Sequence, residues 1–297
     1  MIWRNVMFDK QSYISSFTDI LTLRDLADGT ISNYRSYLDQ YLTFLETSLG
    51  GKPPEEVTWP ELRSYILHLK DNKQLSNRSI NPHIAQLRDF FRYTLHRDWD
   101  HYEVPFLKYD EYLPSVPTKQ EMEYIIETME NLKYKSILAV MYSAGLRVKE
   151  AVSLRYEDIS RKRLQIHISK SKNRSERKAI LAHKTLDLLT HYWRTCGRPM
   201  GYLFPGQKPD RHISTESVRL MMKKHLAALG MQDKGYTPHS CRHCFGLTLY
   251  ERGVDLLAIR DAMGHKSLSS TILYASLGIG SDHGITSPYD MEDRIHD

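Results

Sequence analysis

Apolar residues in the first hundred positions recur at steps of three and four, the periodicity of helices that bury one face. The pattern predicts about four helices, near residues 12–26, over 30–49, from 58 to 69 and over 80–95. At the start of the third helix, Thr58 can cap the helix and Glu61 can reach back to it, as in a capping box. This part of the chain therefore predicts a compact helical unit.

The periodicity is lost between residues 104 and 118, where three prolines interrupt the chain. A stretch of this kind is typical of a linker between two domains. We therefore expect a helical domain at 1–105, a linker at 106–117, a second domain at 118–277 and a tail at 278–297.

The second domain is predicted to open with two helices. Thr118 and Glu121 have the spacing of another capping box, ahead of a helix expected over 122–132. The run of apolar residues over 136–144 predicts a buried helix, which should end at Gly145 because glycine breaks the pattern there.

A small antiparallel sheet is expected next. Apolar and polar residues alternate over 164–168, which predicts a strand, and 177–181 is its expected partner across a polar turn. Helical patterns resume at 184 and dominate to about 277, whereas the glycine-rich tail shows no clear period. The fold class is therefore mainly α, with a helical domain followed by a mostly helical α+β domain.

Composition excludes several classes of protein. The 297 residues are 41% hydrophobic and 26% charged, which is ordinary for a globular protein. The longest apolar stretch, around 137–142, is far shorter than the roughly 20 residues of a membrane-spanning helix. The chain begins without the pattern of a signal peptide, and three cysteines are too few for a disulfide framework. We therefore expect a cytoplasmic protein with no membrane partner.

Charge is distributed unevenly along the chain. The formal net charge is +5, but residues 161–184 alone hold nine Lys or Arg and one Glu, a net of +8. Residues 282–297 hold five acids and one Arg, a net of -4. The basic block favours an anionic partner such as nucleic acid.

The motif with the most specific chemistry is Thr-Pro-His-Ser-Cys-Arg-His at 237–243. Pro238 is a favoured first residue of a helix, and on that helix His239 and Arg242 share a face near the N-terminus. The N–H groups and the dipole at such a terminus favour an anion. His239 and Arg242 together have the arrangement that a phosphodiester site needs, but by itself the same spacing is also common in a solvated pair on a helix surface. His243 is expected to pack beside the site.

Three further motifs lie in a fixed order around this one. Residues 145–150 read Gly-Leu-Arg-Val-Lys-Glu, Gly-His lies at 264–265, and Tyr274 follows nine residues after His265. In this order and spacing the chain resembles the phage integrase or tyrosine recombinase family, whose pattern is G-x-R-x-x-E, a lysine in a β-turn, H-x-x-R, G-H and a nucleophilic tyrosine. The resemblance covers about 118–277 and implies the DNA-breaking-rejoining enzyme fold. The N-terminal unit looks like the family's SAM-like core-binding domain.

The resemblance implies roles for the motif residues. Arg147 and Arg242 would hold the scissile phosphate, and Tyr274 would attack it. His239 would be the general base or a hydrogen-bond donor on the phosphate side, and His265 would donate to the phosphate. The family's reaction passes through a 3′-phosphotyrosyl intermediate and a Holliday junction, and it needs no cofactor and no metal.

A lysine would donate a proton to the leaving 5′-oxygen. Aligning the polar turn with the family pattern favours Lys172 as this general acid, while Lys170 remains the alternative. Glu150 would orient either Arg147 or the turn lysine. The basic residues expected to contact the DNA backbone are Lys170, Arg174, Arg177 and Lys178.

The chain departs from the family pattern at several positions. Cys241, Cys244, Met263 and Ile180 replace residues that are more common in the family, but these are small or apolar exchanges that leave the chemistry intact. The tail is the larger departure, because it does not look like the strong C-terminal helix with which family members often dock on a neighbour.

We expect a site-specific DNA recombinase that integrates, excises or resolves a mobile element. Its partners would be double-stranded DNA with recombination sites, and copies of itself as a dimer on each site and a tetramer in the synapse, near the nucleoid. The alternative is a silent, recombinase-like DNA-binding protein, and a third reading is a DNA-relaxing topoisomerase. A zinc site at His239, Cys241, His243 and Cys244 is disfavoured, because no second ligand pair with suitable spacing exists.

Overall fold

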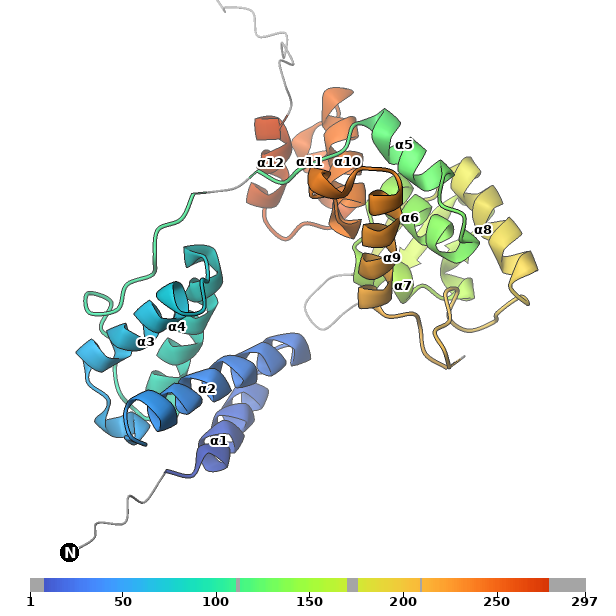
Figure 1. Ribbon diagram of the computed structural model, residues 1–297. Helices are drawn as coiled ribbons and strands as arrows, with labels where there is room; N and C mark the ends of the chain where they lie inside the picture. Colours follow the sequence, from blue (N-terminus) through green and yellow to red (C-terminus); the bar gives the residue numbers. More distant parts are fainter. Residues whose placement is uncertain (1–7, 111–112, 170–175, 209, 278–297) are drawn as a thin grey trace, which may run out of the picture. The chain divides into compact units, whose positions relative to one another are not determined.

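The computed structural model describes residues 8–110, 113–169, 176–208 and 210–277, which form two compact units (Figure 1). The units are Met1–Glu111 and Tyr112–Asp297, and each is described by itself. The tail at 278–297, for which no regular structure was expected, lies outside the described residues.

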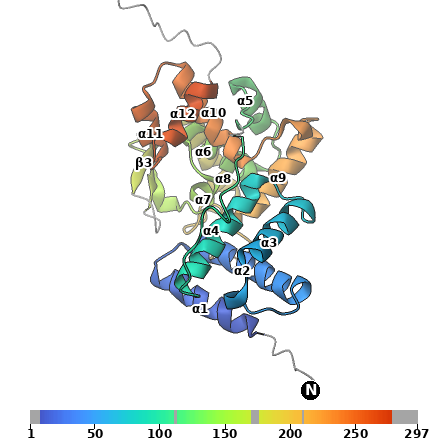
Figure 2. The ribbon, with the colours of Figure 1, turned by 90° about the vertical axis from the view of Figure 1, so that its left-hand side faces the viewer.

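The N-terminal unit is helical, as predicted. Its elements are α1 (Lys10–Leu23), α2 (Asp28–Ser48), the 3-10 turn η1 (Pro54–Glu56), α3 (Trp59–Asp71) and α4 (Asn77–Tyr93) (Figures 1 and 2). The capping pair before α3 is present, since the Thr58 N–H donates to the Glu61 carboxylate at 2.8 Å. Large aromatic side chains fill the core, among them Phe17, Tyr41 and Phe90, each 0% exposed.

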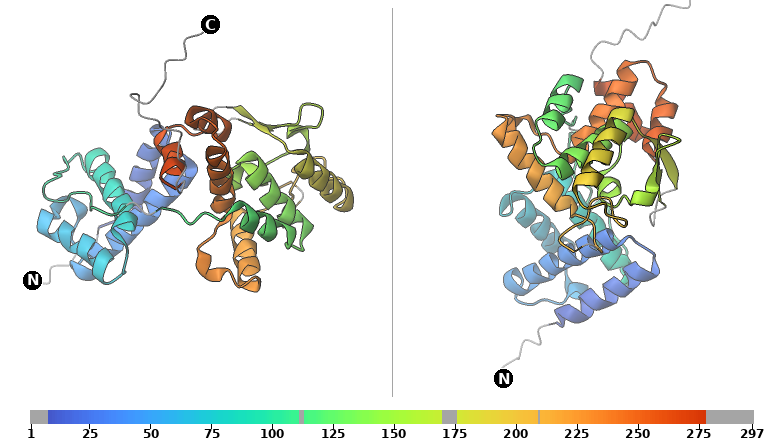
Figure 3. Two further views of the ribbon diagram at one scale, coloured as in Figure 1. Left: turned by 90° about the horizontal axis from the view of Figure 1, so that it is seen from above. Right: turned by 90° about the vertical axis from the view of Figure 1, so that its right-hand side faces the viewer.

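The C-terminal unit is mostly helical and carries one small sheet (Figure 3). Its elements are α5 (Lys119–Glu127), α6 (Leu132–Ala144), α7 (Val148–Val152), η2 (Tyr156–Asp158), β1 (Ile159–Ser160), β2 (Gln165–Ile168), β3 (Arg177–Ile180), α8 (His183–Thr195), α9 (Thr215–Ala228), η3 (Gln232–Lys234), α10 (Pro238–Glu251), α11 (Leu256–Met263) and α12 (Ser269–Leu277). The strands pair antiparallel in the order β1-β2-β3. The expected fold class is therefore confirmed.

Three details differ from the prediction. The helix expected over 122–132 ends at Glu127, because the Asn131 side chain accepts hydrogen bonds from the N–H groups of Lys133 and Tyr134 and so starts α6 at Leu132. Between α8 and α9 the helical pattern is interrupted, because three glycines and three prolines lie between residues 197 and 209. The strand β1 was not expected.

Helix α6 is the centre of the C-terminal core. It contacts α5, α7, α8 and α10, and its residues Ile137 and Val140 are fully buried. It ends at Gly145, whose φ of 60° is a left-handed conformation that favours glycine. A side chain there would also overlap the ring of Phe245 on α10. This close approach fixes the segment that leads from α6 to Arg147.

None of the helices in the described ranges combines the length and apolar character needed to span a bilayer.

Candidate active site

A buried carboxylate, that of Glu150 on α7, organises the motif residues. Within the described part of the chain, Arg147 donates to it through its backbone N–H and Nη1 at 2.9 and 3.0 Å, and Arg177 donates through Nη1 and Nη2 at 3.1 and 3.0 Å. The Glu150 side chain is only 9% exposed. Burial by itself raises the pKa of Glu150, but the hydrogen bonds from Arg177 and from the Arg147 backbone outweigh it and hold the pKa at about 2.

Arg242 lies on α10 and is 4% exposed. Its Nη1 donates to the carbonyl oxygen of Gly145, and its Nη2 donates to that of Met263 at 2.6 Å. Nη1 is also 4.0 Å from Oε2 of Glu150. Burial, with the nearby Arg147 charge, lowers the pKa of Arg242 to about 9. The guanidinium is therefore fixed by backbone carbonyls at the C-terminal ends of α6 and α11 and is largely removed from water.

The turn after α11 joins the two arginines to a histidine. Gly264 ends that helix with φ 60°, and its carbonyl oxygen accepts from Arg147 Nη2 at 3.1 Å. The next residue, His265, has its Nδ1 2.8 Å from Oγ1 of Thr271, which is fully buried. Burial and the arginine charges, first that of Arg242, lower the pKa of His265 to about 4, so its ring is neutral at pH 7.

Tyr274 on α12 is 1% exposed and its ring lies against Gly246 of α10, where an added methyl group would overlap it. The ring is stacked near His265, with centroids 6.4 Å apart, and His243 meets it edge-on at 6.2 Å. Burial raises the pKa of Tyr274 to about 12, although the charges of Arg242 and Arg147 act to lower it. The phenol is therefore protonated at neutral pH in this arrangement.

His239 is exposed on the first turn of α10, with Pro238 as the first residue of the helix. It lies close enough to contribute, after burial, to lowering the pKa of His243 to about 4. The Nδ1 of His243 is buried and has no hydrogen-bond partner among the described residues. The sequence indicated only a packing role for His243, and its edge-on contact with Tyr274 was not foreseen.

The structure therefore gathers Arg147, Glu150, Arg242, His265 and Tyr274 from α6–α7, α10, α11 and α12. Three positions with an expected role in catalysis or in DNA contact, Lys170, Lys172 and Arg174, lie outside the described residues.

Two of the expected DNA contacts are described, and they differ from each other. Lys178 is exposed on β3. Arg177, which precedes it, is 11% exposed and directs its guanidinium to Glu150. From the sequence, both residues were expected to contact the DNA backbone, and it is the structure that separates them.

The charges in this cluster do not cancel. Three guanidinium groups, those of Arg147, Arg177 and Arg242, lie within 4.0 Å of the single carboxylate of Glu150. A net excess of two positive charges in a desolvated site favours an anion, and paired guanidinium groups suit the oxygens of a phosphate. Within the described ranges, no three His, Cys, Asp or Glu side chains are grouped so that they could hold a metal ion.

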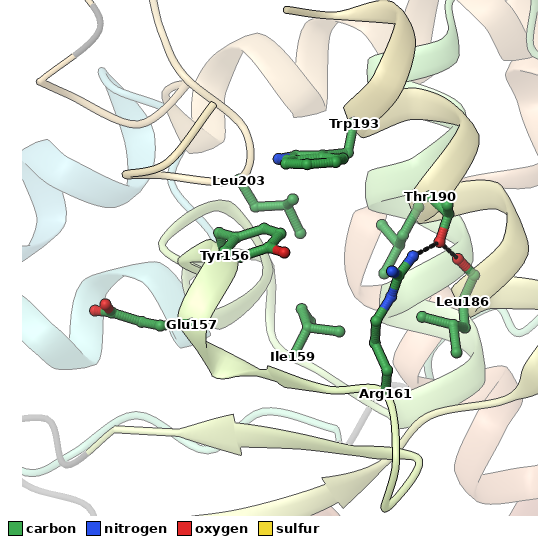
Figure 4. A pocket seen from close by; sticks show the side chains of 9 residues that line it. Tyr156, Glu157, Ile159, Arg161, Leu186, Thr190, Trp193 and Leu203 are labelled. Carbon is green, nitrogen blue, oxygen red and sulfur yellow. Dashed lines mark hydrogen bonds between the residues drawn. The ribbon is translucent and has the colours of Figure 1, made fainter. Parts of the chain in front are cut away.

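A separate cleft lies between η2, β1 and α8 and shares no residue with this cluster (Figure 4). Tyr156 and Trp193 stack there with ring centroids 5.1 Å apart, and Arg161 donates to the hydroxyl of Thr190. Its remaining lining is largely apolar, so it lacks the converging positive charge of the Glu150 cluster.

Comparison with known families matches both units of the chain. Residues 116–278 match the phage integrase family, and residues 14–101 match the phage integrase N-terminal SAM-like domain. A putative integrase/recombinase, y4qK of Sinorhizobium fredii, is 34% identical over 267 residues, which are 89% of this chain and 85% of that protein. The tyrosine recombinase XerA of Pyrococcus horikoshii is 28% identical over 269 residues, 89% of this chain and 88% of that protein.

Solved structures show the same fold. The crystal structure of XerA recombinase aligns with a TM-score of 0.51 at 25% identity, covering 90% of this chain and 93% of that one. A lambda integrase dimer bound to a COC′ core site aligns with a TM-score of 0.71 at 19% identity, covering 89% and 94%. The Tn1549 transposon integrase in complex with circular intermediate DNA gives 0.69 at 18% identity, covering 88% and 94%.

Proposed function

The chain belongs to the phage integrase family of tyrosine-type site-specific recombinases, and we propose that it cuts and rejoins DNA through a 3′-phosphotyrosyl intermediate on Tyr274. One observation carries the proposal. Helix α10 supplies both the buried guanidinium of Arg242 and, one turn later, the Gly246 surface on which the Tyr274 ring lies. A phosphate held by the arginines would therefore be close to the phenol.

Arg147 and Arg242 bind the scissile phosphate in this proposal. Negative charge gathers on the non-bridging oxygens as the phosphorus is attacked, and fixed guanidinium groups stabilise that charge without rearranging. Carbonyl oxygens already hold both side chains, so little reorganisation is needed when DNA binds.

The reaction exchanges one phosphorus–oxygen bond for another. Oη of Tyr274 forms a bond to phosphorus while the bond to the 5′-oxygen breaks. A phenol with a pKa of about 12 does not ionise unaided at neutral pH, so its proton passes to a base as the bond forms. The exposed His239 is the proposed base or phosphate-side donor, and Lys172, outside the described residues, is the proposed acid for the 5′-oxygen.

His265 donates a hydrogen bond to the same phosphate. Its ring is neutral, and if Nδ1 accepts from the Thr271 hydroxyl, then Nε2 carries the proton. Thr271 thereby sets the tautomer that can donate to an anion.

The energy of the broken bond is kept in the phosphotyrosyl ester, so a new 5′-hydroxyl can reseal the strand in reverse. Two rounds of exchange would pass through a Holliday junction between two recombination sites. A dimer on each site and a tetramer in the synapse would carry this out, on a mobile element that integrates, excises or is resolved, in association with the nucleoid. Lys178, Lys170 and Arg174 would contact the DNA backbone.

A nicked suicide substrate tests the proposal. When its short 5′ fragment diffuses away, religation is prevented and the protein should remain attached to the 3′ end as a covalent adduct. Tyr274→Phe should abolish the adduct. Tyr250→Phe is the matched control, because Tyr250 packs against the same small apolar cluster, and it should form the adduct.

Two results would count against the proposal. DNA binding without an adduct in the wild-type chain would indicate the silent DNA-binding alternative. Adduct formation that survives Tyr274→Phe would show that another residue is the nucleophile.

A further inference from the structure

We propose that Arg177 is a positioning residue for this reaction: it fixes and neutralises the carboxylate that orients Arg147, and it does not contact DNA. The inference rests on the proposed function, because its consequence is a correctly placed, fully charged Arg147 at the phosphate. It also assigns Arg177 a role that differs from the backbone contact expected from its place in the basic block.

The first support is that Arg177 donates a forked pair of hydrogen bonds to Glu150. Arg147 donates two hydrogen bonds to this carboxylate, and the guanidinium of Arg177 donates two more, at 3.1 and 3.0 Å. An ionised carboxylate accepts hydrogen bonds at both oxygens, so contacts of this kind hold it in one plane and one rotamer.

The second support is that Arg177 lies against two residues that hold the Arg147 guanidinium. One is Glu150, and the other is Gly264, whose carbonyl oxygen accepts from Arg147 Nη2 at 3.1 Å. The stem of Arg177 crosses Gly264 so closely that a Cβ there would lie 2.8 Å from Cδ and 3.0 Å from Nε. Strand β3 also contacts α11, next to this turn (Figure 2).

The third support is the balance of charge. If Glu150 faced Arg147 alone, the pair would be neutral, and orienting the arginine would cancel the charge that the phosphate needs. Arg177 adds a second cation at hydrogen-bond distance from the same carboxylate. With Arg242 at 4.0 Å, Arg147 is therefore oriented while these groups keep an excess of two positive charges, which would fall to one without Arg177.

The buried position of the Arg177 guanidinium is not the most favourable one for the stability of the fold. The Nε of Arg177 is buried and has no hydrogen-bond partner among the described residues, and burying an unpaired N–H is unfavourable. A lysine at position 177 would have no buried, unpaired Nε–H group, but it could not make the forked contact with both oxygens of Glu150.

A comparison of two neighbouring residues tests the inference. Arg177→Met and Lys178→Met each remove one positive charge from β3, but only Lys178 is exposed. We would measure DNA affinity against salt, and the single-turnover rate of adduct formation on the nicked substrate at saturating protein. Lys178→Met should reduce the log–log salt slope by about 0.9, the value for one phosphate contact.

Arg177→Met should leave that slope unchanged and slow adduct formation by about 10- to 100-fold, because Arg147 is misplaced. A slope reduced as in Lys178→Met would overturn the inference and return Arg177 to the DNA backbone. An unchanged slope with an unchanged rate would also overturn it.

A second variant separates positioning from loss of folding. Glu150→Gln combined with Arg177→Met removes the carboxylate that Arg177 neutralises, so the double variant should form adduct several-fold faster than Arg177→Met alone. A double variant slower than Arg177→Met would overturn the charge argument. If Arg177→Met does not fold, Arg177→Lys serves in both experiments.

Different results would contradict the proposed function and this inference. Absence of an adduct in the wild-type chain contradicts the former, whereas the inference is judged only from variants of an active protein.

Discussion

The two sides of the candidate site are built differently. On the arginine side, Arg147 and Arg242 are held by Glu150 and by three backbone carbonyls, beside the large core around α6. On the tyrosine side, Tyr274 belongs to a separate small cluster with Phe245, Ile259 and Met263, and its ring packs against Gly246. Strong directional bonds fix the charges, while packing of apolar surface places the nucleophile.

This difference indicates which catalytic groups are already in place before DNA binds. Preorganised charge is the larger contribution to catalysis, because it stabilises the transition state without rearrangement. A cluster of four buried residues opens at a lower cost in free energy than the main core does. We therefore expect changes on the arginine side to act on rate and stability more strongly than changes on the tyrosine side that keep its hydroxyl.

Arg242→Lys should have the largest effect. An ammonium group cannot donate to the carbonyl oxygens of Gly145 and Met263 and also present a pair of coplanar N–H groups to phosphate. Loss of one such donor costs about 2.7–4 kcal/mol of barrier, so single-turnover adduct formation should fall by about 10²–10³. Arg219→Lys, on the exposed pair with Glu216 on α9, should react like the wild type. A loss of less than about fivefold in Arg242→Lys would contradict the idea of a fixed phosphate clamp.

Glu150→Gln should reduce stability in a pH-dependent way. The folded-state pKa of Glu150, about 2, lies below the ordinary value of 4.5, so its stabilising contribution is fully present above pH 4.5 and is lost as the pH falls to 2. The shift corresponds to about 3 kcal/mol. The difference in the free energy of unfolding between wild type and variant should therefore shrink over that range in denaturant titrations. A difference that does not change with pH would show that the charge of Glu150 contributes nothing.

The sequence predicted much of this site, because its residues lie in motifs whose order and spacing carry the information. Those motifs named Arg147, Glu150, Arg242, His265 and Tyr274, and the structure brings these five together. The roles assigned to them remain proposals. What the motifs could not supply was the pairing of Arg177 with Glu150.

The pairing of Arg177 with Glu150 was not foreseen, for a physical reason. Arg177 lies 27 positions after Glu150, in the basic block at 161–184, where nine residues are Lys or Arg. Successive side chains of a strand point to opposite faces, so residues two apart share a face. If the apolar Ile180 is taken to point inward, Lys178 is predicted to point inward as well. In the structure Ile180 is 56% exposed and Ala179 is 3% exposed, so Arg177 faces inward. The small inward residue was the only signal in the sequence, and it is a weak one.

Gly246→Ala tests the tyrosine side with a smaller change. The added methyl group would overlap the Tyr274 ring, while alanine suits the helix better than glycine does. Overpacking of this kind costs typically 1–3 kcal/mol, so the ring should move and adduct formation should fall about tenfold, with Arg147 and Arg242 undisturbed. Limited proteolysis should detect the loosened α12. Unchanged kinetics with unchanged protection would show that contact with Gly246 does not place the nucleophile.

Thr271→Val should have the smallest effect. Thr271 connects the two sides of the site, because it lies on α12 with Tyr274 and its hydroxyl lies beside His265. Valine keeps the shape of the buried threonine but removes the hydroxyl 2.8 Å from Nδ1 of His265. Because that ring is neutral, it loses the partner that favours a proton on Nε2, and a fraction of molecules would present an acceptor to the phosphate. A neutral hydrogen bond contributes about 1 kcal/mol, so adduct formation should slow about fivefold.

The matched control for Thr271→Val is Thr185→Val, which removes another buried hydroxyl, one bonded to Ser143 at 2.9 Å. Both variants should lose similar stability, because each loses one buried hydrogen bond. Only Thr271→Val should slow adduct formation, because Thr185 makes no contact with His265 or with the arginines in the described structure. Equal slowing in the two variants would mean that stability, and not the tautomer of His265, limits the reaction.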